Sequence, residues 1–321
     1  MNILMIAQND PAGTAISFTK AINRHTEHNC RLITTETRYN FDYEKDLHVP
    51  DFTGSEWDLV HQLLKEADII HFHMLADEYL ELGGGIRISQ YIPGKKIIHH
   101  HHGHPEFRSN PELFREKYKK LGRASLVSTP DLLKLLPEAS WIPNLVPLDE
   151  PLYTPLPHHG ISPSPFIIAH SPTRKDLKNT TELMGAVQNL HSKGYSKKLK
   201  LKILEWTPHR QCLEEKRKSH AVFDHMQGYY GVSSLESLAQ GKPVIAGLDH
   251  WNIRHIKSFT GADQLPWIIA RNARELEEKI KYLADHEQVI ETIGQQARSF
   301  MEIYWNEKRV LERIFNVYDE L

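Results

Sequence analysis

The amino-acid sequence predicts an α/β protein with two doubly wound parallel-sheet domains. Short apolar runs of strand length recur along the chain, amphipathic segments separate them, and one proline-rich stretch divides the series in two. Continuous apolar runs are typical of strands that helices cover on both faces, as in parallel sheets. The 321 residues also suffice for two domains, each with its own core.

The first half of the chain contains four expected strands. They are the apolar runs at 2–7, 67–73, 95–100 and 124–129. Residues 55–67 are expected to form a helix, because Leu59, Leu63 and Leu64 recur at helical spacing. This alternation of strands with helices predicts a parallel sheet wrapped by helices.

A linker is expected at residues 147–165, PLDEPLYTPLPHHGISPSP, which hold six prolines in nineteen residues. Proline neither donates to a sheet ladder nor continues a helix. After this stretch the pattern restarts, with strands expected at 165–171, 199–205, 221–226, 242–247 and 265–270. Helices are expected at 179–194, 208–219, 233–241 and 272–286, followed by two closing helices near 287–300 and 302–319. We therefore expect a first domain at 1–155, a second at 156–301, and a C-terminal helix, 302–321, that packs back on the first domain.

The composition narrows the class of function. With 25% charged residues and a formal net charge of −2, the chain has no field that would collect a polyanion, so no nucleic-acid partner is expected. The two cysteines, Cys30 and Cys212, form neither a disulfide framework nor a C-x-x-C site. The opening residues do not resemble a signal peptide, and no run of about eighteen apolar residues occurs. A cytoplasmic protein is expected, with at most peripheral contact at the inner face of the membrane.

Three loops that follow predicted strands are the places to look for chemistry, because open parallel sheets bind ligands at the carboxyl ends of their strands. The first is QNDPAGTA, 8–15, which contains Gly13. It lacks the G-x-G-x-x-G pattern, which weakens a dinucleotide interpretation. A plain turn before an N-capped helix explains it equally well.

The second loop lies in HMQGYYGVSSLESLAQGKPVIAG, 225–247. Gly228 and Gly231 frame two tyrosines, and a helix is expected to open with Val232 and Ser233. A helix N-terminus beside glycines presents backbone N–H groups to a phosphate or a sugar hydroxyl. Glu236, near one turn in, can accept hydrogen bonds from a ribose diol or can simply complement the helix dipole.

The third loop is HSPTRKDLKNT, 170–180. It places Arg174 and Lys178 beside a helix start, where two cations can neutralise a diphosphate. Solvated surface charge is the alternative.

In this order and spacing, the segments resemble the retaining glycosyltransferases of the GT-B fold, in particular glycosyltransferase family 4. The resemblance covers nearly the whole chain, and YYGVSSLESLAQGKPVIA, similar to the family signature "GFGLxxlEAmAxGxPVia", is its most specific part. The other matching stretches are MNILMIAQNDPAG, ADIIHFHM, KKIIHHHHGHPE, ASLVSTPDLLKLLPEASWIPNLV and RKDLKNT. The resemblance implies two Rossmann-like domains that face a central cleft.

The same resemblance implies an activity. Family members transfer a sugar from a nucleotide-sugar, here expected to be a UDP-sugar, to an acceptor hydroxyl with retention, in glycan or glycoconjugate synthesis. The expected partners are this donor and a carbohydrate or lipid-linked acceptor, with no metal and no other cofactor. Arg174 and Lys178 inherit a catalytic role on the leaving diphosphate. The donor-binding residues implied are Gly13, Arg174, Lys178, Asp224, Gly231, Val232, Ser233 and Glu236.

Two positions depart from the family pattern. The signature has two glutamates, and the first would fall on Gly228, so the carboxylate that contacts the donor sugar is absent there. Asp224, four residues earlier, is expected to reach the same region. Asn179 stands where the lysine is usually followed by glycine. The missing glutamate keeps two alternatives open: a non-catalytic GT-B partner subunit of a glycosyltransferase complex, and a nucleotide-sugar epimerase on the same fold.

The run IIHHHHGHPE, 97–106, is not expected to bind a metal. Side chains alternate along a strand, so His99 and His101 face one way while His100 and His102 face the other, and four consecutive histidines cannot converge on one ion. The resemblance instead places a catalytic histidine at His102, just before Gly103, where it would contact the donor sugar or orient the acceptor hydroxyl.

One further segment bears on the acceptor: residues 110–124 are rich in basic side chains. In some relatives a basic helix in this half touches anionic lipid. Here Glu112 and Glu116 interleave with the cations, so an ordinary solvated face is the competing interpretation. The cations are Arg115, Lys117, Lys119, Lys120 and Arg123.

Overall fold

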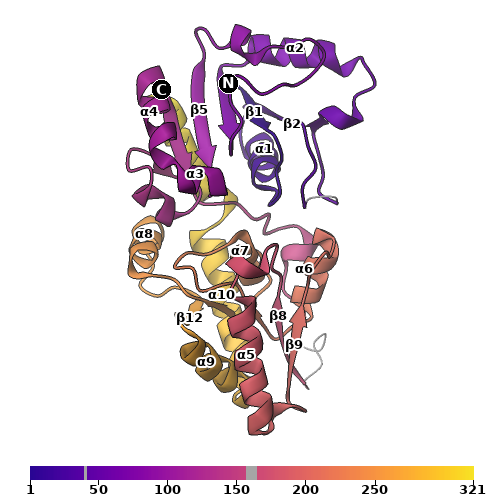
Figure 1. Ribbon diagram of the computed structural model, residues 1–321, viewed down its shortest axis with the longest axis vertical. Coiled ribbons are helices and arrows are strands. Elements are labelled where there is room, and N and C mark those ends of the chain that lie inside the picture. The colour runs from indigo at the N-terminus through magenta and orange to yellow at the C-terminus, as the bar shows by residue number, and fades with distance from the viewer. Residues whose placement is uncertain (40–41, 157–164) are drawn as a thin grey trace. The chain divides into compact units, whose positions relative to one another are not determined.

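The protein folds into two compact units, as a computed structural model shows (Figure 1). The structure describes residues 1–39, 42–156 and 165–321. The first unit comprises Met1–Leu145 and Glu307–Leu321, and the second comprises Val146–Asn306. The division falls at 145/146, ten residues before the predicted boundary. Of the predicted linker, 157–164 lie outside the described residues, whereas Pro151–Tyr153 form a short 3₁₀ helix in the second unit.

The first unit is built on a seven-stranded sheet in the order β3-β2-β1-β4-β5-β6-β7, and every neighbouring pair is parallel. Its strands are β1 (Asn2–Ala7), β2 (Asn29–Thr34), β3 (Leu47–His48), β4 (Ile69–His73), β5 (Lys96–His101), β6 (Ala124–Val127) and β7 (Ser140–Trp141). Its α-helices are α1 (Thr14–His25), α2 (Glu56–Glu66), α3 (Pro105–Ser109), α4 (Pro111–Leu121) and α11 (Glu307–Glu320). The central strands β1 and β4 are almost entirely buried, as helices on both faces of a parallel sheet require, although β4 also carries His71 and His73.

The C-terminal helix α11 belongs to the first unit, although it follows the whole of the second unit in the sequence. It contacts α1, where Glu307 accepts hydrogen bonds from Arg24 and lies 2.6 Å from His25 Nε2. At its other end the Tyr318 side chain is fully buried and reaches the central strands of the sheet. The helix therefore closes one face of this unit.

The second unit is built on a five-stranded parallel sheet in the order β12-β11-β10-β8-β9. Its strands are β8 (Phe166–His170), β9 (Leu199–Ile203), β10 (Ala221–Phe223), β11 (Val244–Ala246) and β12 (Trp267–Ile269). Its α-helices are α5 (Thr180–Leu190), α6 (His209–Arg217), α7 (Val232–Ala239), α8 (His250–Thr260), α9 (Ala273–Asp285) and α10 (Gln288–Tyr304). Buried residues from β8, β10, α5 and α9 form its main apolar core.

Helix α7 corresponds to the helix predicted at 233–241. Two glycines allow it to pack closely against α10. A Cβ on Gly294 would lie 2.2 Å from the carbonyl oxygen of Gly241, so the two backbones touch where α7 ends. Only glycine permits this approach. The contact fixes the position of α7 within the unit.

The predicted α/β class with two parallel, Rossmann-like sheets is confirmed. All nine expected strands are present, but β2, β3 and β7 were not predicted. Polar Asn29 and Arg31 interrupt the apolar pattern of β2, while β3 and β7 are only two residues long. None of the helices among the described residues is both long and apolar enough to cross a membrane.

Candidate functional site

The predicted donor-binding residues of the second unit gather at the carboxyl ends of β8 and β10. These strands are neighbours, and Phe223 pairs with His170 at their last residues. The segment after β8 carries Lys178, and the segment after β10 carries Asp224 and Gly231 before α7 opens at Val232. The topology therefore places two of the three predicted loops side by side, as expected for an open parallel sheet.

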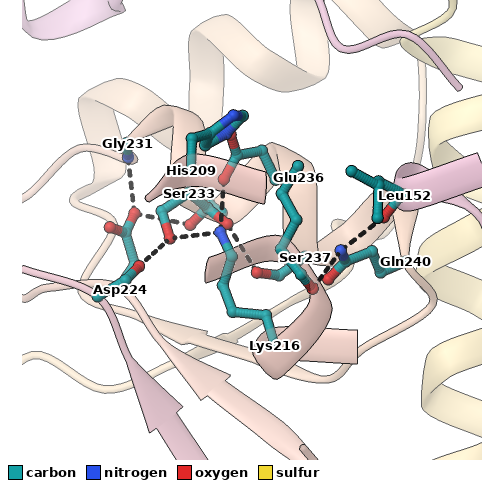
Figure 2. A network of polar contacts seen from close by, with 12 residues as sticks. Leu152, His209, Lys216, Asp224, Gly231, Ser233, Glu236, Ser237 and Gln240 are labelled. Carbon is teal, nitrogen blue, oxygen red and sulfur yellow. Dashed lines mark hydrogen bonds and ion pairs between the residues drawn. The ribbon is translucent and has the colours of Figure 1, made fainter. Parts of the chain in front are cut away.

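Asp224 stabilises the start of α7 by hydrogen bonds. Its Oδ2 accepts hydrogen bonds from the Gly231 backbone N–H at 2.6 Å and from the Ser234 hydroxyl at 2.7 Å (Figure 2). Burial alone would raise the pKa of Asp224, but the nearby His225 and Lys178 side chains and the two hydrogen bonds hold that pKa below its ordinary value. The carboxylate is thus ionised and fixed at the helix N-terminus, where a negative charge is favourable.

Lys178 lies over the same helix start. A Cβ on Gly231 would be 3.1 Å from Asp224 Oδ1 and 3.4 Å from Lys178 Nζ, so glycine leaves room for both charged groups. The structure therefore brings Lys178, Asp224 and Gly231 together. Arg174, by contrast, has an exposed side chain whose Nε donates to Asp176 at 3.1 Å. Of the two predicted cations, Lys178 lies at the start of α7, whereas Arg174 is paired with Asp176 at the surface.

Glu236 is buried in a charged network that the sequence did not reveal (Figure 2). Its Oε1 lies 2.6 Å from His209 Nε2, and its Oε2 accepts from Lys216 Nζ at 2.5 Å. Both partners come from α6. Burial alone would raise the pKa of Glu236, but Lys216 and His209 lower it to about 2. The carboxylate is therefore charged at neutral pH and held in one orientation.

Ser233 links this network to the loop after β8. Its hydroxyl lies 3.1 Å from the Ser171 hydroxyl and accepts from Lys216 Nζ at 3.3 Å. Ser171 directly follows β8 and was not among the predicted site residues. Its proximity to Ser233 could not be predicted from the sequence, because it depends on the pairing of β8 with β10.

Asn179 explains one departure from the family pattern. Its backbone has a positive φ of 53°, in the left-handed region that favours glycine and that asparagine tolerates better than most residues. The side chain then adds a contact that glycine lacks, because its Oδ1 accepts from the Met226 backbone N–H at 2.8 Å. Asn179 thus ties the loop after β8 to the loop after β10.

Gly228, where the first signature glutamate would fall, has a φ of 90°. A side chain there would be strained, so this backbone itself disfavours a glutamate. A Cβ on Gly228 would lie 3.5 Å from Asp249 Oδ2, and the Asp249 N–H donates to the Gly228 carbonyl at 2.8 Å. An acidic side chain therefore lies beside the vacant position, supplied by Asp249 from the start of α8.

The remaining predicted residues, Gly13 and His102, lie in the first unit. Gly13 has a φ of 65° and precedes α1, and a Cβ there would lie 2.7 Å from the Tyr43 ring. His102 is partly buried, and its Nε2 lies 2.9 Å from His73 Nδ1. Burial lowers the pKa of His102 to about 3, so its imidazole is neutral.

The other histidines of the run lie on two faces of β5. His101 lies on the side of α3 and α4, with its Nε2 2.7 Å from the Tyr118 hydroxyl and its ring stacked on Phe107. His100 lies with His71 and His73 of β4 on the opposite face. His104 caps α3 by accepting from the Glu106 N–H.

The chain matches no family model and no curated protein. Solved structures do match it. HepE from Anabaena, in complex with UDP and glucose, shares a TM-score of 0.69 and 15% identity over 100% of both chains. An α-glucosyltransferase in complex with UDP and a DNA 13-mer shares a TM-score of 0.68 and 11% identity over 98% of both chains.

The chain has the GT-B fold. A glycosyltransferase from Rickettsia africae shares this fold as well, with a TM-score of 0.63 and 14% identity over 99% of this chain and 98% of that one. The resemblance inferred from the sequence motifs is therefore confirmed at the level of architecture. On this fold, the edge of the second unit that holds Lys178, Asp224 and Gly231 is the candidate site.

Proposed function

We propose that this GT-B protein transfers a sugar from a UDP-sugar to an acceptor hydroxyl, with retention at the anomeric carbon and without a catalytic metal. The observation that carries the proposal is the joint placement of Lys178 and the start of α7. An ammonium group and a helix N-terminus meet there, with Ser233 and Ser171 hydroxyls beside them. Such a combination favours a diphosphate.

The charges of the site suit the departure of a nucleoside diphosphate. Negative charge develops on the leaving group, and fixed cations and helix amides stabilise it without proton transfer. Lys178 is already fixed beside Asp224, whereas Arg174 would exchange its exposed partner Asp176 for the diphosphate. Exchange of an exposed ion pair costs little, because such pairs contribute about 0–1 kcal/mol.

In this proposal Glu236 binds the ribose of the donor. Each carboxylate oxygen offers about two lone-pair directions, so both oxygens can accept a ribose hydroxyl while His209 and Lys216 keep their bonds. In this proposal Asp249, which lies beside Gly228, contacts the donor sugar in place of the absent glutamate, whereas Asp224, expected in that role from the sequence, holds the start of α7. HepE and the α-glucosyltransferase were both solved with UDP, which supports uracil as the base of the donor.

The acceptor in this proposal is a carbohydrate or a lipid-linked carbohydrate, with His102 of the first unit directed to its hydroxyl. Direct membrane contact through α4 has weaker support. Of the five cations there, three form ion pairs with acidic residues of the same unit: Arg115 with Glu138, Lys117 with Asp77 and Arg123 with Glu78. These pairs reduce the charge available to an anionic lipid surface.

A second candidate is a non-catalytic partner subunit, favoured by Gly228 in place of the sugar-contacting glutamate. Isothermal titration of the full chain with UDP, GDP and ADP separates the two, since a subunit without a donor site would bind none of them. We expect UDP to bind, and Lys178→Ala to weaken its binding by about 10- to 100-fold, because charged hydrogen bonds contribute about 1.5–3 kcal/mol. Lys193→Ala, which removes a cation paired with Glu277 on the surface of the same unit, should leave the affinity unchanged.

Catalysis needs its own measurement. Incubation with a panel of UDP-sugars should release UDP slowly without an acceptor and faster with one. Binding of UDP with no transfer from any UDP-sugar to any acceptor would contradict the proposed activity. Conversion of one UDP-sugar into another would instead identify an epimerase.

A further inference from the structure

Three histidines of the first unit form a buried cluster on one face of the sheet. His71 and His73 lie two residues apart on β4, so both point to the same face. His100 of β5 is the register partner of His73 and joins them on that face. All three are at most 1% exposed.

The hydrogen bonds of the cluster leave one ring nitrogen of His71, one of His73 and both of His100 without a partner among the described residues. His71 Nδ1 lies 2.7 Å from the Tyr318 hydroxyl, and His73 Nδ1 lies 2.9 Å from His102 Nε2. In the part of the chain that the structure describes, His71 Nε2, His73 Nε2 and both nitrogens of His100 have no hydrogen-bond partner. A buried polar atom without a partner costs about 1–3 kcal/mol, so three such rings together call for a ligand.

We propose that His71, His73 and His100 bind a divalent transition-metal ion of the zinc class. One ligand atom from each ring lies within 4.8 Å of the other two. Imidazole nitrogens are common ligands of such ions. Magnesium and calcium prefer oxygen ligands, so an all-imidazole set selects zinc, cobalt, nickel or copper.

The contacts around His71 and His73 match those of known histidine metal sites. Metal-bound histidines usually make a hydrogen bond through their second nitrogen, which fixes the tautomer and the ring orientation. Tyr318 does this for His71, and His102 does it for His73. The fourth position would be open to water, as in three-histidine zinc sites.

Binding requires a small rearrangement of the rings. The rings of His71 and His73 are stacked, with centroids 4.5 Å apart and planes 15° from parallel. Zinc–nitrogen bonds of about 2.0–2.1 Å set the ligand atoms of a tetrahedral site about 3.3 Å apart. In the proposal the rings rotate about χ2 until the nitrogens reach this spacing, and the bound ion would join β4, β5 and, through the Tyr318 contact with His71, helix α11.

This site is compatible with the alternation argument that excluded four consecutive histidines. The three ligands come from two strands, and only His100 belongs to the run. The inference does not depend on the proposed transferase activity, since none of the three ligands lies in the second unit. We assign the ion a role in holding the first unit together.

Cobalt and zinc titration of the chelator-treated full chain tests the proposal. We expect one equivalent of Co²⁺ to bind with visible d–d absorption typical of tetrahedral nitrogen ligation, and Zn²⁺ to displace it. Zn²⁺ should also raise the melting temperature, because an ion that binds only the folded state stabilises it. His100→Ala should abolish the absorption, whereas His250→Ala, which removes an exposed histidine, should leave it intact.

A second variant keeps the test decisive if His100→Ala does not fold. Tyr318→Phe keeps the buried ring but removes the hydroxyl beside His71. We expect the same stoichiometry with about 10- to 100-fold weaker affinity, the usual cost of losing such an outer contact. Absence of stoichiometric binding, binding that survives His100→Ala, or an affinity unaffected by Tyr318→Phe would each overturn the proposal and leave the rings as a hydrated or packed cluster.

Discussion

The two units stabilise buried polar groups in different ways. At β4 and β5 of the first unit, burial holds the pKa of His73 and His100 well below the ordinary range, so the imidazoles are neutral. At β8 and β10 of the second unit, Asp224, Glu236 and Lys216 are equally buried yet remain charged. The difference is pairing: each of these charges faces an opposite charge or a hydrogen-bond donor, whereas the imidazoles face one another.

The charged site of the second unit and the histidine cluster of the first are therefore suited to different ligands. Lys178 and the start of α7 are already in place for an anionic ligand, and only the exposed Arg174 would exchange its partner when that ligand binds. A set of neutral nitrogen lone pairs suits a metal ion or a hydroxyl group. The experiments below test whether pairing is what separates the two edges.

The largest effect is expected from Lys216→Met. The change leaves the Glu236 carboxylate buried without its main counter-charge, and breaking a buried ion pair typically costs about 3–5 kcal/mol. The free energy of unfolding of the second unit, from urea titration followed by circular dichroism, should fall by that amount. Replacing both partners, Lys216→Met with Glu236→Gln, should recover most of the loss.

Lys193→Met is the matched control for this measurement. It breaks the exposed pair with Glu277 in the same unit, and exposed pairs contribute about 0–1 kcal/mol. If Lys216→Met cost no more than Lys193→Met, pairing would not be what keeps the second edge charged.

Arg174→Ala should have the next largest effect, on rate rather than stability. Electrostatic donors to developing negative charge contribute about 2.7–4 kcal/mol, so kcat should fall roughly 100- to 1000-fold. Because the side chain is exposed, the unfolding free energy should change by less than about 0.5 kcal/mol. Arg274→Ala removes an even more exposed arginine, from α9, and should leave kcat unchanged. Normal turnover of folded Arg174→Ala would remove this residue from the mechanism.

Acid should weaken the second unit through Glu236. Its folded-state pKa of about 2 lies below the ordinary value near 4.5, so its contribution to stability is complete above pH 4.5 and disappears as the pH falls towards 2. At about 1.4 kcal/mol per pKa unit, this amounts to about 3 kcal/mol. Other carboxylates also titrate in this window, so the difference between wild type and Glu236→Gln isolates the effect. Parallel stability curves for the two proteins between pH 5 and pH 3 would show that Glu236 is not held ionised by its partners.

The sequence was sufficient to predict the fold, because the central strands are continuous apolar runs. It was insufficient for strand β2, whose Asn29 and Arg31 break the apolar pattern. Strand β7 is too short to show any periodicity. The positions of Lys178, Asp224 and Gly231 at adjacent strand ends also followed from their place after predicted strands.

The charged network could not be predicted, because α6 carries several cations and nothing in PHRQCLEEKRKS marks the one that turns inward. Lys216 is fully buried while its neighbour Arg217 is only partly so, and tertiary packing alone makes that choice. The histidine cluster was missed for a related reason. Its members become neighbours only when β4 and β5 are paired in register.

The smallest effect is expected at Asn179, which connects the two loops of the charged edge. Asn179→Gly keeps the left-handed backbone easily but loses the bond to the Met226 N–H, and should cost about 0.5–1.5 kcal/mol of stability. Asn179→Ala loses the same bond and must also place a Cβ in the left-handed region, which adds about 1–2 kcal/mol. Thermal or urea unfolding of both variants measures the two contributions separately. Equal costs would mean that the amide bond matters and the backbone conformation does not, whereas a neutral Asn179→Gly would mean that the loops of this edge are held together by the charges alone.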